Sequence, residues 1–558
     1  MVSIDSTHRG TTRKGRGLSV KKCLYAVLCF SCCILLLPIL ASLVLDADSI
    51  HAYVKEPPQW RPMEPASLPQ LRHTASNSNG NQQQKRYAEE SQPPDGTFNG
   101  FPVHLRVIDD NEQQQPTHYS RVHCVGDNYQ PDDDWLQRSC HFSMLCYDLA
   151  ERDFVIFQSY REQVLNRFLQ ARPAMSVSSI MHRKFNETTA VALGGINKKW
   201  NYDIKTPVSS KGFKWFPRVL NATNSMQYYA LPANTVLVPY HSLAAKNPGH
   251  LVWDDFLPIY TLLTMFQLQN RVLIPLRVHF NHIKLWSSCE MSDHNEHLCQ
   301  KMTLKFASLL VGKDYPYNWT TTDTVHFVPS SSQQSQSSPQ SNYVCAPRGA
   351  AGLGPLTDHG TKKLHGWIRD DYKITHNHGR GALLYEFRNF MLQNLGLPLQ
   401  PVTSQQQPFK VVFSVSSSDI GSRDLDFVKQ INTLRENFDP TILSVESYVM
   451  KDLTVPQQVQ IASEAAFFIT ICGGGAVTAM FLPKGATVIL YYLEHGGVEY
   501  GRPTHSYAFL DWDLFNNLSH LRTHWLPTQT MDNRIDLRAL VLLMEQELEL
   551  MQNENMMI

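Results

Sequence analysis

The sequence predicts an α/β protein with two globular domains behind a membrane anchor. Three observations support this prediction: apolar runs alternate with helical patterns in the carboxyl half, a glycine turn interrupts them at 473–475, and residues 23–45 carry no charge. Alternating strands and helices are typical of parallel sheets with crossover helices. Residues 96–558 are also too many for one ordinary core.

Predicted strands and helices alternate along the carboxyl half. In order they are strand 410–415, helix 424–436, strand 441–445, helix 456–465, strand 466–471 and, after the glycine turn, strand 487–492. Pro456 fits the first turn of its helix, where a backbone N–H has no intrahelical partner. The amino half is less regular, with strand 235–239, helix 256–266 and strand 271–278.

Gly473, Gly474 and Gly475 stand between a buried strand and a short helix. Glycine adopts positive φ readily and lets other groups approach the backbone. A helix that begins there directs N–H groups and the positive end of its dipole at a ligand, which predicts a phosphate or diphosphate site. The G-x-G-x-x-G and Walker patterns of phosphate-binding loops are absent. The alternative is therefore a glycine-rich connection that packs tightly under a helix and binds no ligand.

The amino terminus has three segments. Uncharged residues 23–45 would form a helix of about 34 Å at ~1.5 Å per residue, long enough to span a bilayer. Basic residues dominate the preceding 1–22, which predicts a cytosolic tail and a lumenal remainder. A cleaved signal peptide is the alternative, but the apolar run is long and no clean cleavage site follows. Residues 46–95, rich in Pro, Gln, Ser and Asn, predict a flexible stem.

Residues 96–329 and 343–558 are the two predicted domains, and the polar segment 330–342 is either a linker or a surface loop. The chain has 50 basic and 50 acidic residues and therefore no formal net charge. Because no long basic run follows residue 22, nucleic acid is not an expected partner.

Cysteines and sequons both indicate an oxidising compartment. Four of the 11 cysteines lie within residues 23–45. Beyond them Cys124, Cys140 and Cys146 cluster, as do Cys289 and Cys299, so we expect one or two disulfides and at least one free thiol, with zinc as the alternative. Four N-x-[ST] glycosylation sequons are found at Asn186, Asn221, Asn318 and Asn517.

Three blocks of the sequence resemble the family-61 glycosyltransferases. The glycine turn is similar to the family's H-G-A-G-L-T-N-x-x-F-L-P-P-G signature, and a helix carrying Gln457 and Gln458 precedes it. The matching residues are Gly473, Gly475, Phe481, Leu482, Pro483 and Gly485. Upstream, Asn247, His250, Asp254 and Pro258 are similar to parts of G-N-x-x-H-D-x-x-D-x-x-x-P, and the region from Cys124 to Cys146 is similar to the family's amino-terminal cysteine region.

The resemblance implies a GT-B-like fold with two Rossmann-like domains. It also implies an inverting transferase that moves a sugar from a nucleotide sugar, UDP-linked in our interpretation, to a glycan or glycoprotein acceptor. The carboxyl domain would hold the nucleotide and the amino domain the acceptor. It further implies a single-pass type II membrane protein of the Golgi, with the endoplasmic reticulum membrane as the alternative location.

Departures from the signature affect the predicted donor pocket. Cys472 stands at the family's histidine, Thr478 at its asparagine and Leu490 where an acidic residue usually ends the next strand. Arg423 takes the place of a basic pair, and Ser416, with the two serines after it, forms either a phosphate contact or a polar turn. The chain therefore either uses a different sugar nucleotide or is a non-catalytic lumenal glycan or nucleotide binder.

An inverting transfer needs one general base on the acceptor hydroxyl. Asp254 is the expected base, with His250 as its partner or competitor. These two side chains share a helix face only if the helix begins before Trp253. Asp255 is the adjacent fallback and an alternative N-cap for the helix from 256, and capping is also the alternative role for Asp254.

Two further clusters are interpreted as loops. The acidic run 132–134 follows Pro131 and predicts a solvated turn, so no essential metal is expected. The histidine-rich stretch 358–381 leads into a helix at 382–395, from which Arg388 could reach the cleft. A third hypothesis, a dinucleotide-dependent oxidoreductase, lacks both the G-x-G-x-x-G fingerprint and a downstream ribose carboxylate.

Overall fold

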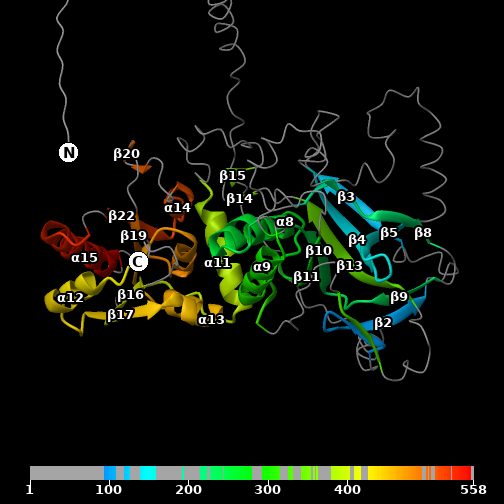
Figure 1. The fold of residues 1–558 in the computed structure, drawn as a ribbon, viewed down its shortest axis with the longest axis horizontal. Helices are drawn as coiled ribbons and strands as arrows, with labels where there is room; N and C mark the ends of the chain where they lie inside the picture. The colour runs from blue at the N-terminus through cyan, green and yellow to red at the C-terminus, as the bar shows by residue number, and fades with distance from the viewer. Residues whose placement is uncertain are drawn as a thin grey trace, which may run out of the picture. The chain divides into compact units, whose positions relative to one another are not determined.

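In the computed structural model, residues 92–558 form one compact unit (Figure 1). The structure describes residues 94–107, 119–125, 138–158, 191–193, 214–222, 226–242, 244–278, 289, 292–313, 325–330, 341–352, 356–357, 360–361, 379–402, 407–415, 425–492, 498–499, 502–503, 509–528 and 531–554. The predicted tail and membrane span, and the stem up to residue 93, lie outside these ranges and stay predictions. Within them, no helix has the length and apolar character needed to cross a bilayer.

A mixed sheet of eleven strands forms the amino part of this unit. Its strands are β1 (Gly96–Phe98), β2 (Phe101–Val107), β3 (Arg121–Val125), β4 (Ser139–Asp148), β5 (Asp153–Gln158), β8 (Arg218–Asn221), β9 (Gln227–Ala230), β10 (Thr235–Tyr240), β11 (Val272–Arg277), β12 (Phe327–Pro329) and β13 (Tyr343–Gly352). Strand β13 pairs in parallel with β9 and β10 and antiparallel with β4. The predicted strands 235–239 and 271–278 are confirmed as β10 and β11, which pair in parallel.

The chain returns to this first sheet after the polar segment 330–342. The sequence placed residues from 343 onward in the carboxyl domain, but β13 pairs with three strands of the amino half. The first sheet is also mixed, whereas a Rossmann-like domain has a mainly parallel sheet. What the structure establishes is a mixed α/β fold with this large sheet and a second, all-parallel one.

The second sheet has five parallel strands in the order β17-β16-β18-β19-β22. They are β16 (Phe409–Val415), β17 (Leu443–Val449), β18 (Phe467–Ile471), β19 (Ala486–Tyr492) and β22 (Leu521–Pro527). The alternation predicted from the sequence is confirmed. Strand β17 begins two residues later than expected, because the Asp439 carboxylate accepts hydrogen bonds from the N–H and hydroxyl of Thr441 at 2.8 and 2.6 Å and holds a turn there.

Helices connect and cover the two sheets. They are α7 (Pro248–His250), the π-helix η2 (Leu251–Phe256), α8 (Leu257–Met265), α9 (Asp293–Phe306), α10 (Ser308–Val311), α11 (Gly381–Asn394), α12 (Val428–Asn437), the 3₁₀ helices η8 (Met450–Asp452) and η9 (Gly474–Phe481), α13 (Val455–Ser463), α14 (Phe509–Phe515) and α15 (Arg534–Glu554). Short strand pairs are β6 (Val191–Ala192) with β7 (Lys214–Trp215), β14 (Leu356–Thr357) with β15 (Gly360–Thr361), and β20 (Val498–Glu499) with β21 (Arg502–Pro503).

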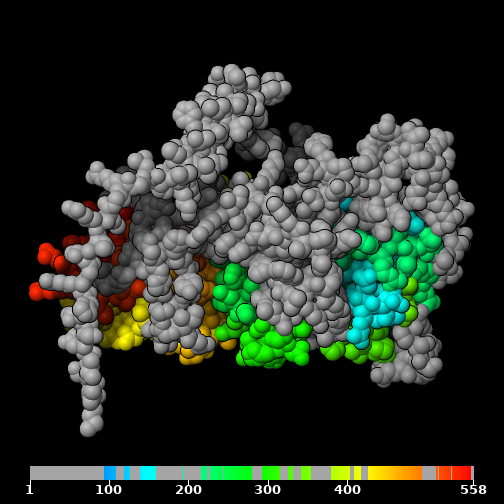
Figure 2. All heavy atoms as spheres, turned by 45° about the horizontal axis from the view of Figure 1, so that its top comes forward, coloured from blue at the N-terminus to red at the C-terminus, as the bar shows by residue number. Residues whose placement is uncertain are grey.

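Alternate residues of the second sheet face two different cores, as the two-residue period of a strand requires. Val411 and Ile469 pack in a cluster with α12 and α15 on one face. Val412 and Phe468 point the other way, into a core that also contains Val236 of β10 and residues of α8, α9 and α11. These helices lie between the sheets in Figure 1, and in Figure 2 green atoms lie between the yellow and orange atoms on one side and the cyan atoms on the other. One continuous apolar core therefore holds both sheets together.

Three disulfides link the described cysteines: Cys124–Cys140, Cys146–Cys345 and Cys289–Cys299. The odd thiol is Cys472, which is buried. The expected cysteine outside any disulfide is thus confirmed, whereas the expected one or two disulfides were too few because Cys146 pairs with a cysteine 199 residues away. The paired sulfurs are not thiolate ligands for zinc. Three disulfides indicate an extracellular or secretory-pathway domain.

A buried carboxylate fastens α15 to the second sheet. Glu547 accepts hydrogen bonds from the Thr487 hydroxyl at 2.6 Å, from Arg522 Nε at 2.5 Å and from His524 Nε2 at 2.8 Å. Burial alone would raise the pKa of Glu547, but these donors lower it to about 2. Since the folded pKa is depressed, the stabilisation is present above about pH 4.5 and is lost as the pH falls toward 2.

Replacing Glu547 by Gln should lower the free energy of unfolding by about 3 kcal/mol at pH 7, because Arg522 then loses its buried partner. Urea unfolding at a series of pH values measures the effect. Between pH 4.5 and 2 the wild-type chain should lose stability faster than Glu547→Gln. The exposed Glu549 of the same helix provides the control, and a Glu549→Gln effect of equal size would contradict this assignment.

Candidate functional site

A cavity of about 350 Å³ opens at the carboxyl ends of β17 and β18. Met450 and Lys451 line it directly after β17, and Ile471 and Cys472 line it at the end of β18. Strand β16 lies between these two strands in the sheet. The chain therefore passes from β17 on one side of β16 to β18 on its other side. This reversal of strand order is where open α/β sheets bind their ligands.

Three lysines approach this cavity from different elements. Lys246 precedes α7, Lys305 lies in α9 and Lys451 lies in η8. Lys305 Nζ donates to the backbone carbonyl of Lys451 at 3.1 Å, which joins α9 to η8 beside the cavity. Among the described residues that line the cavity, these are the charged ones, so its local potential favours an anion such as a diphosphate.

The strand, turn, helix and strand predicted around the glycines are confirmed, and the helix is the 3₁₀ helix η9. Gly473 has φ of +133°, a conformation that needs glycine. Its N–H donates to Asp511 Oδ2 at 2.6 Å, so this particular N–H already has a protein acceptor. Gly474, Gly475 and Thr478 line the cavity beside it.

Gly474 also makes a close contact within the protein. A Cβ at this position would lie 2.0 Å from Asn247 Oδ1, and a Cβ on Gly249 would lie 3.2 Å from Gly474 Cα. Asn247 itself accepts the Gly249 N–H at 2.9 Å and caps α7. At Gly474 the structure therefore shows the tight packing of the alternative interpretation, and a ligand contact at the glycines stays a prediction.

His250 and Asp254 form a hydrogen-bonded pair in the helical segment that Asn247 caps. The helix begins at Pro248, earlier than Trp253, so the two side chains share a face and His250 Nδ1 lies 2.7 Å from Asp254 Oδ2. The helix continues as η2, in which the Leu257 N–H donates to the carbonyl of Val252, five residues back. Pro258 has no N–H for the carbonyl of Asp254, which favours this wider turn.

Acidic neighbours control the charge of His250. Burial lowers its pKa, but Asp254, Asp255 and Asp511 together raise it above the ordinary value. Asp254 is only 5% exposed, whereas the His250 side chain keeps 29% of its surface accessible. The imidazole of His250 is therefore the group of the pair that a substrate can reach, and Asp254 is hydrogen-bonded to its Nδ1.

Asp255 lies inside the continuous helix rather than at an N-cap, so the predicted capping role is wrong for it and for Asp254. The cap of the segment is Asn247. Asp255 is buried, accepts the Ser242 hydroxyl at 2.5 Å, and burial raises its pKa to about 8 despite that hydrogen bond. It is a buried structural neighbour of the pair.

Arg388 does not reach a cleft. It lies on α11, which confirms the predicted helix, but it is 1% exposed and donates to the Phe481 carbonyl at 3.0 Å. Burial lowers its pKa to about 10. Leu490 is fully buried in the core that joins the sheets, so no ligand contact follows from its position at the end of β19.

Other predicted residues lie elsewhere. Ser416, Arg423, Asn186, Asn318, the acidic run 132–134 and the histidines between 358 and 378 lie outside the described residues. Asn221 is exposed at the end of β8, and Asn517 is half-buried after α14. The part of the chain that is described contains no group of three His, Cys, Asp or Glu side chains suited to a metal ion.

Several residues of the site were missed by the sequence reasoning. Lys451 follows a parallel strand directly and could have been found from that position. The two glutamines that the resemblance singled out were not missed: Gln458 lines the cavity and donates to the carbonyls of Met450 and Leu453 at 2.7 and 3.0 Å, while Gln457 forms the capping box of α13 with Thr454. Lys305 and Asp511 gave no local signal, because only tertiary packing brings them to the turn.

Comparison with protein-family models and with curated proteins gave no match for this chain. The resemblance to family 61 therefore stays a prediction.

A Gly474→Ala substitution should lower the free energy of unfolding by about 1–3 kcal/mol, because the added methyl meets Asn247. In an Asn247→Ala background the same substitution should cost much less. A double-mutant cycle by chemical denaturation measures this coupling. Equal costs in both backgrounds would show that the contact does not determine the packing of the turn.

Proposed function

We propose that this protein is an inverting glycosyltransferase that moves a sugar from a UDP-linked donor to a glycan or glycoprotein acceptor. The observation that carries the proposal is the lysine-lined cavity at the carboxyl ends of β17 and β18, which lies beside the helix bearing His250 and Asp254. The resemblance of both segments to family 61 supports the same activity.

The donor would place its diphosphate against Lys246, Lys305 and Lys451. Three ammonium groups stabilise the charge that develops on the departing diphosphate, the role that a metal ion serves in other transferases. The glycine turn forms one wall of the cavity and leaves room for phosphate oxygens close to the backbone. This chemistry needs no essential metal.

His250 is the proposed general base, assisted by Asp254. In a single displacement the acceptor oxygen forms a bond to the anomeric carbon, and the bond from that carbon to the diphosphate oxygen breaks. The acceptor proton moves to Nε2 of His250, while Asp254 holds Nδ1 and stabilises the imidazolium. Asp254, our expected base, is too buried to meet an acceptor directly.

The finer architecture belongs to the same proposal. A GT-B-like division would give the nucleotide to the five-stranded sheet and the acceptor to the eleven-stranded sheet. A type II anchor at residues 23–45 would place both in the Golgi lumen, or in the endoplasmic reticulum. Exposed Asn221 fits an N-glycan on this lumenal side.

A non-catalytic nucleotide or glycan binder is the second candidate. Cys472 and Leu490, which replace a histidine and an acidic residue of the family signature, are both buried apolar side chains. They remove polar contacts that a donor would use in the family. Binding without turnover would support this candidate.

UDP and a panel of UDP- and GDP-sugars should raise the melting temperature of the full-length chain if the cavity holds the donor. Lys246→Gln and Lys451→Gln should each weaken binding about tenfold, because each removes one charge-assisted contact to phosphate. Lys484 is exposed and outside the cavity, so Lys484→Gln is the matched control. No stabilisation by any nucleotide would contradict the donor site.

Turnover, or slow donor hydrolysis, should rise with pH through an apparent pKa above 6.5, because the raised pKa keeps His250 protonated until then. Asp254→Asn should move this limb to lower pH and reduce the maximal rate by about 10²-fold or more. Asp532→Asn, at an exposed position far along the chain, is the control. An unchanged profile in Asp254→Asn would exclude the His250–Asp254 pair as the base.

A further inference from the structure

A second cavity, of about 390 Å³, lies on the eleven-stranded sheet. Arg121 of β3, Arg271 just before β11 and Arg348 of β13 line it, together with Tyr119 and Tyr228. It opens at the amino ends of β10 and β11. The lysine-lined cavity follows the carboxyl end of β10, which is six residues or ~20 Å away at ~3.3 Å per residue. The two cavities are therefore separate sites.

An interruption of the sheet shapes the floor of this cavity. The β4–β13 ladder pairs Leu145 with Ala346 and Ser143 with Arg348, but Met144 and Pro347 between them do not pair. Pro347 has no N–H to donate, and Met144 adopts φ of +62°. Such irregularities change the direction in which side chains point from a sheet, and they are common next to binding sites.

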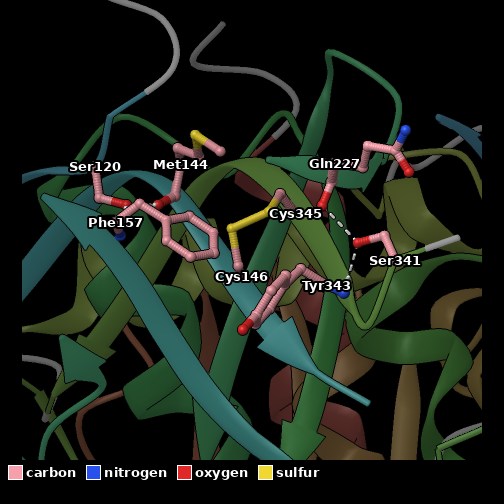
Figure 3. The surroundings of a disulfide bond; sticks show 8 residues. All are labelled: Ser120, Met144, Cys146, Phe157, Gln227, Ser341, Tyr343 and Cys345. Carbon is pink, nitrogen blue, oxygen red and sulfur yellow. Dashed lines mark hydrogen bonds between the residues drawn. A yellow bond between two sulfur atoms is a disulfide. The ribbon is translucent and has the colours of Figure 1, made fainter. Parts of the chain in front are cut away.

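Neighbouring contacts hold the interruption in one conformation (Figure 3). The carbonyl of Met144 accepts the Ser120 hydroxyl at 2.6 Å, and Ser120 Oγ accepts the Phe157 N–H at 2.9 Å. The Cys146–Cys345 disulfide joins β4 to β13 immediately beside it. Cys345 and Met144 both line the cavity, so its floor is cross-linked and hydrogen-bonded.

The charge around this cavity has one sign. No carboxylate is found among the described residues that line it, while arginines from three separate segments do so. Burial, together with the charges of Arg348 and His123, lowers the pKa of nearby His141. Guanidinium groups bind carboxylates and sulfates through paired hydrogen bonds, so an anion would relieve their mutual repulsion.

The remaining lining is partly apolar. Tyr228 is 9% exposed, and Tyr119, Leu231 and Pro347 complete the walls. Tyrosine presents a large apolar face with one polar tip, a surface suited to the face of a sugar ring. The volume is within the range of small-molecule sites. A phosphopeptide would use the arginines alone and leave these walls without a function.

We propose that this cavity binds an anionic sugar unit, with its carboxylate or sulfate on Arg121, Arg271 and Arg348 and its ring against the tyrosines. The site gives the protein a second glycan contact on the first sheet. It does not depend on the proposed transferase activity, because no residue is shared between the two cavities.

The test measures binding to the full-length chain of three fluorescent tetrasaccharides: hyaluronan (carboxylates alone), heparin (sulfates as well as carboxylates) and neutral chitotetraose. We expect binding of one or both anionic probes, and their comparison identifies the anion. The Arg121→Gln/Arg348→Gln double variant should bind at least tenfold more weakly, and Arg534→Gln, at an exposed position outside the cavity, should bind as the wild type does.

Melting temperatures and UDP-induced stabilisation of the double variant should match those of the wild type, which shows that the fold and the lysine cavity are intact. Equal binding of chitotetraose, or anionic binding that the double variant retains, would overturn the proposal. Stronger competition by a phosphopeptide than by either saccharide would assign the cavity to a protein partner instead.

Discussion

The contact between Asn247 and Gly474 is the constraint on which the site depends. A side chain as small as alanine at 474 would collide with Asn247 Oδ1, so the start of α7 can pack directly on the glycine turn only because glycine is there. The same asparagine caps α7 and thereby fixes where the helix begins. That start places His250 and Asp254 on one face, and it brings a helix of the amino half to the end of β18.

Charge is segregated around this contact. On one side, three lysines line a cavity at the ends of β17 and β18. On the other, Asp254, Asp255 and Asp511 surround His250 and raise its pKa. Asp511 joins the two sides, because it accepts the Gly473 N–H and also acts on His250. The proposed transfer from a nucleotide sugar requires a phosphate-binding group next to a proton acceptor, and this segregation of charge is consistent with that proposal.

The core that joins the sheets explains how residues from distant segments stay in register. Even-numbered residues of β16, β18 and β19 enter the same apolar cluster as β10, β11, α8, α9 and α11. Lys305 on α9 and Lys451 after β17 are therefore held within hydrogen-bonding reach, though 146 residues separate them. Rigid packing of this kind positions a site more accurately than loops do.

The sequence by itself determined four of the five strands of the second sheet, the glycine turn and the presence of a cysteine outside any disulfide. Alternating apolar runs predicted β16, β18 and β19, and an odd number of cysteines after residue 45 required at least one cysteine outside any disulfide, because these features depend on local periodicity and simple counting. Only the tertiary structure decided that β13 returns to the first sheet, that Cys146 pairs with Cys345, and that Lys305 and Asp511 reach the turn. These outcomes depend on contacts between residues far apart in the chain, for which a single sequence carries no local signal.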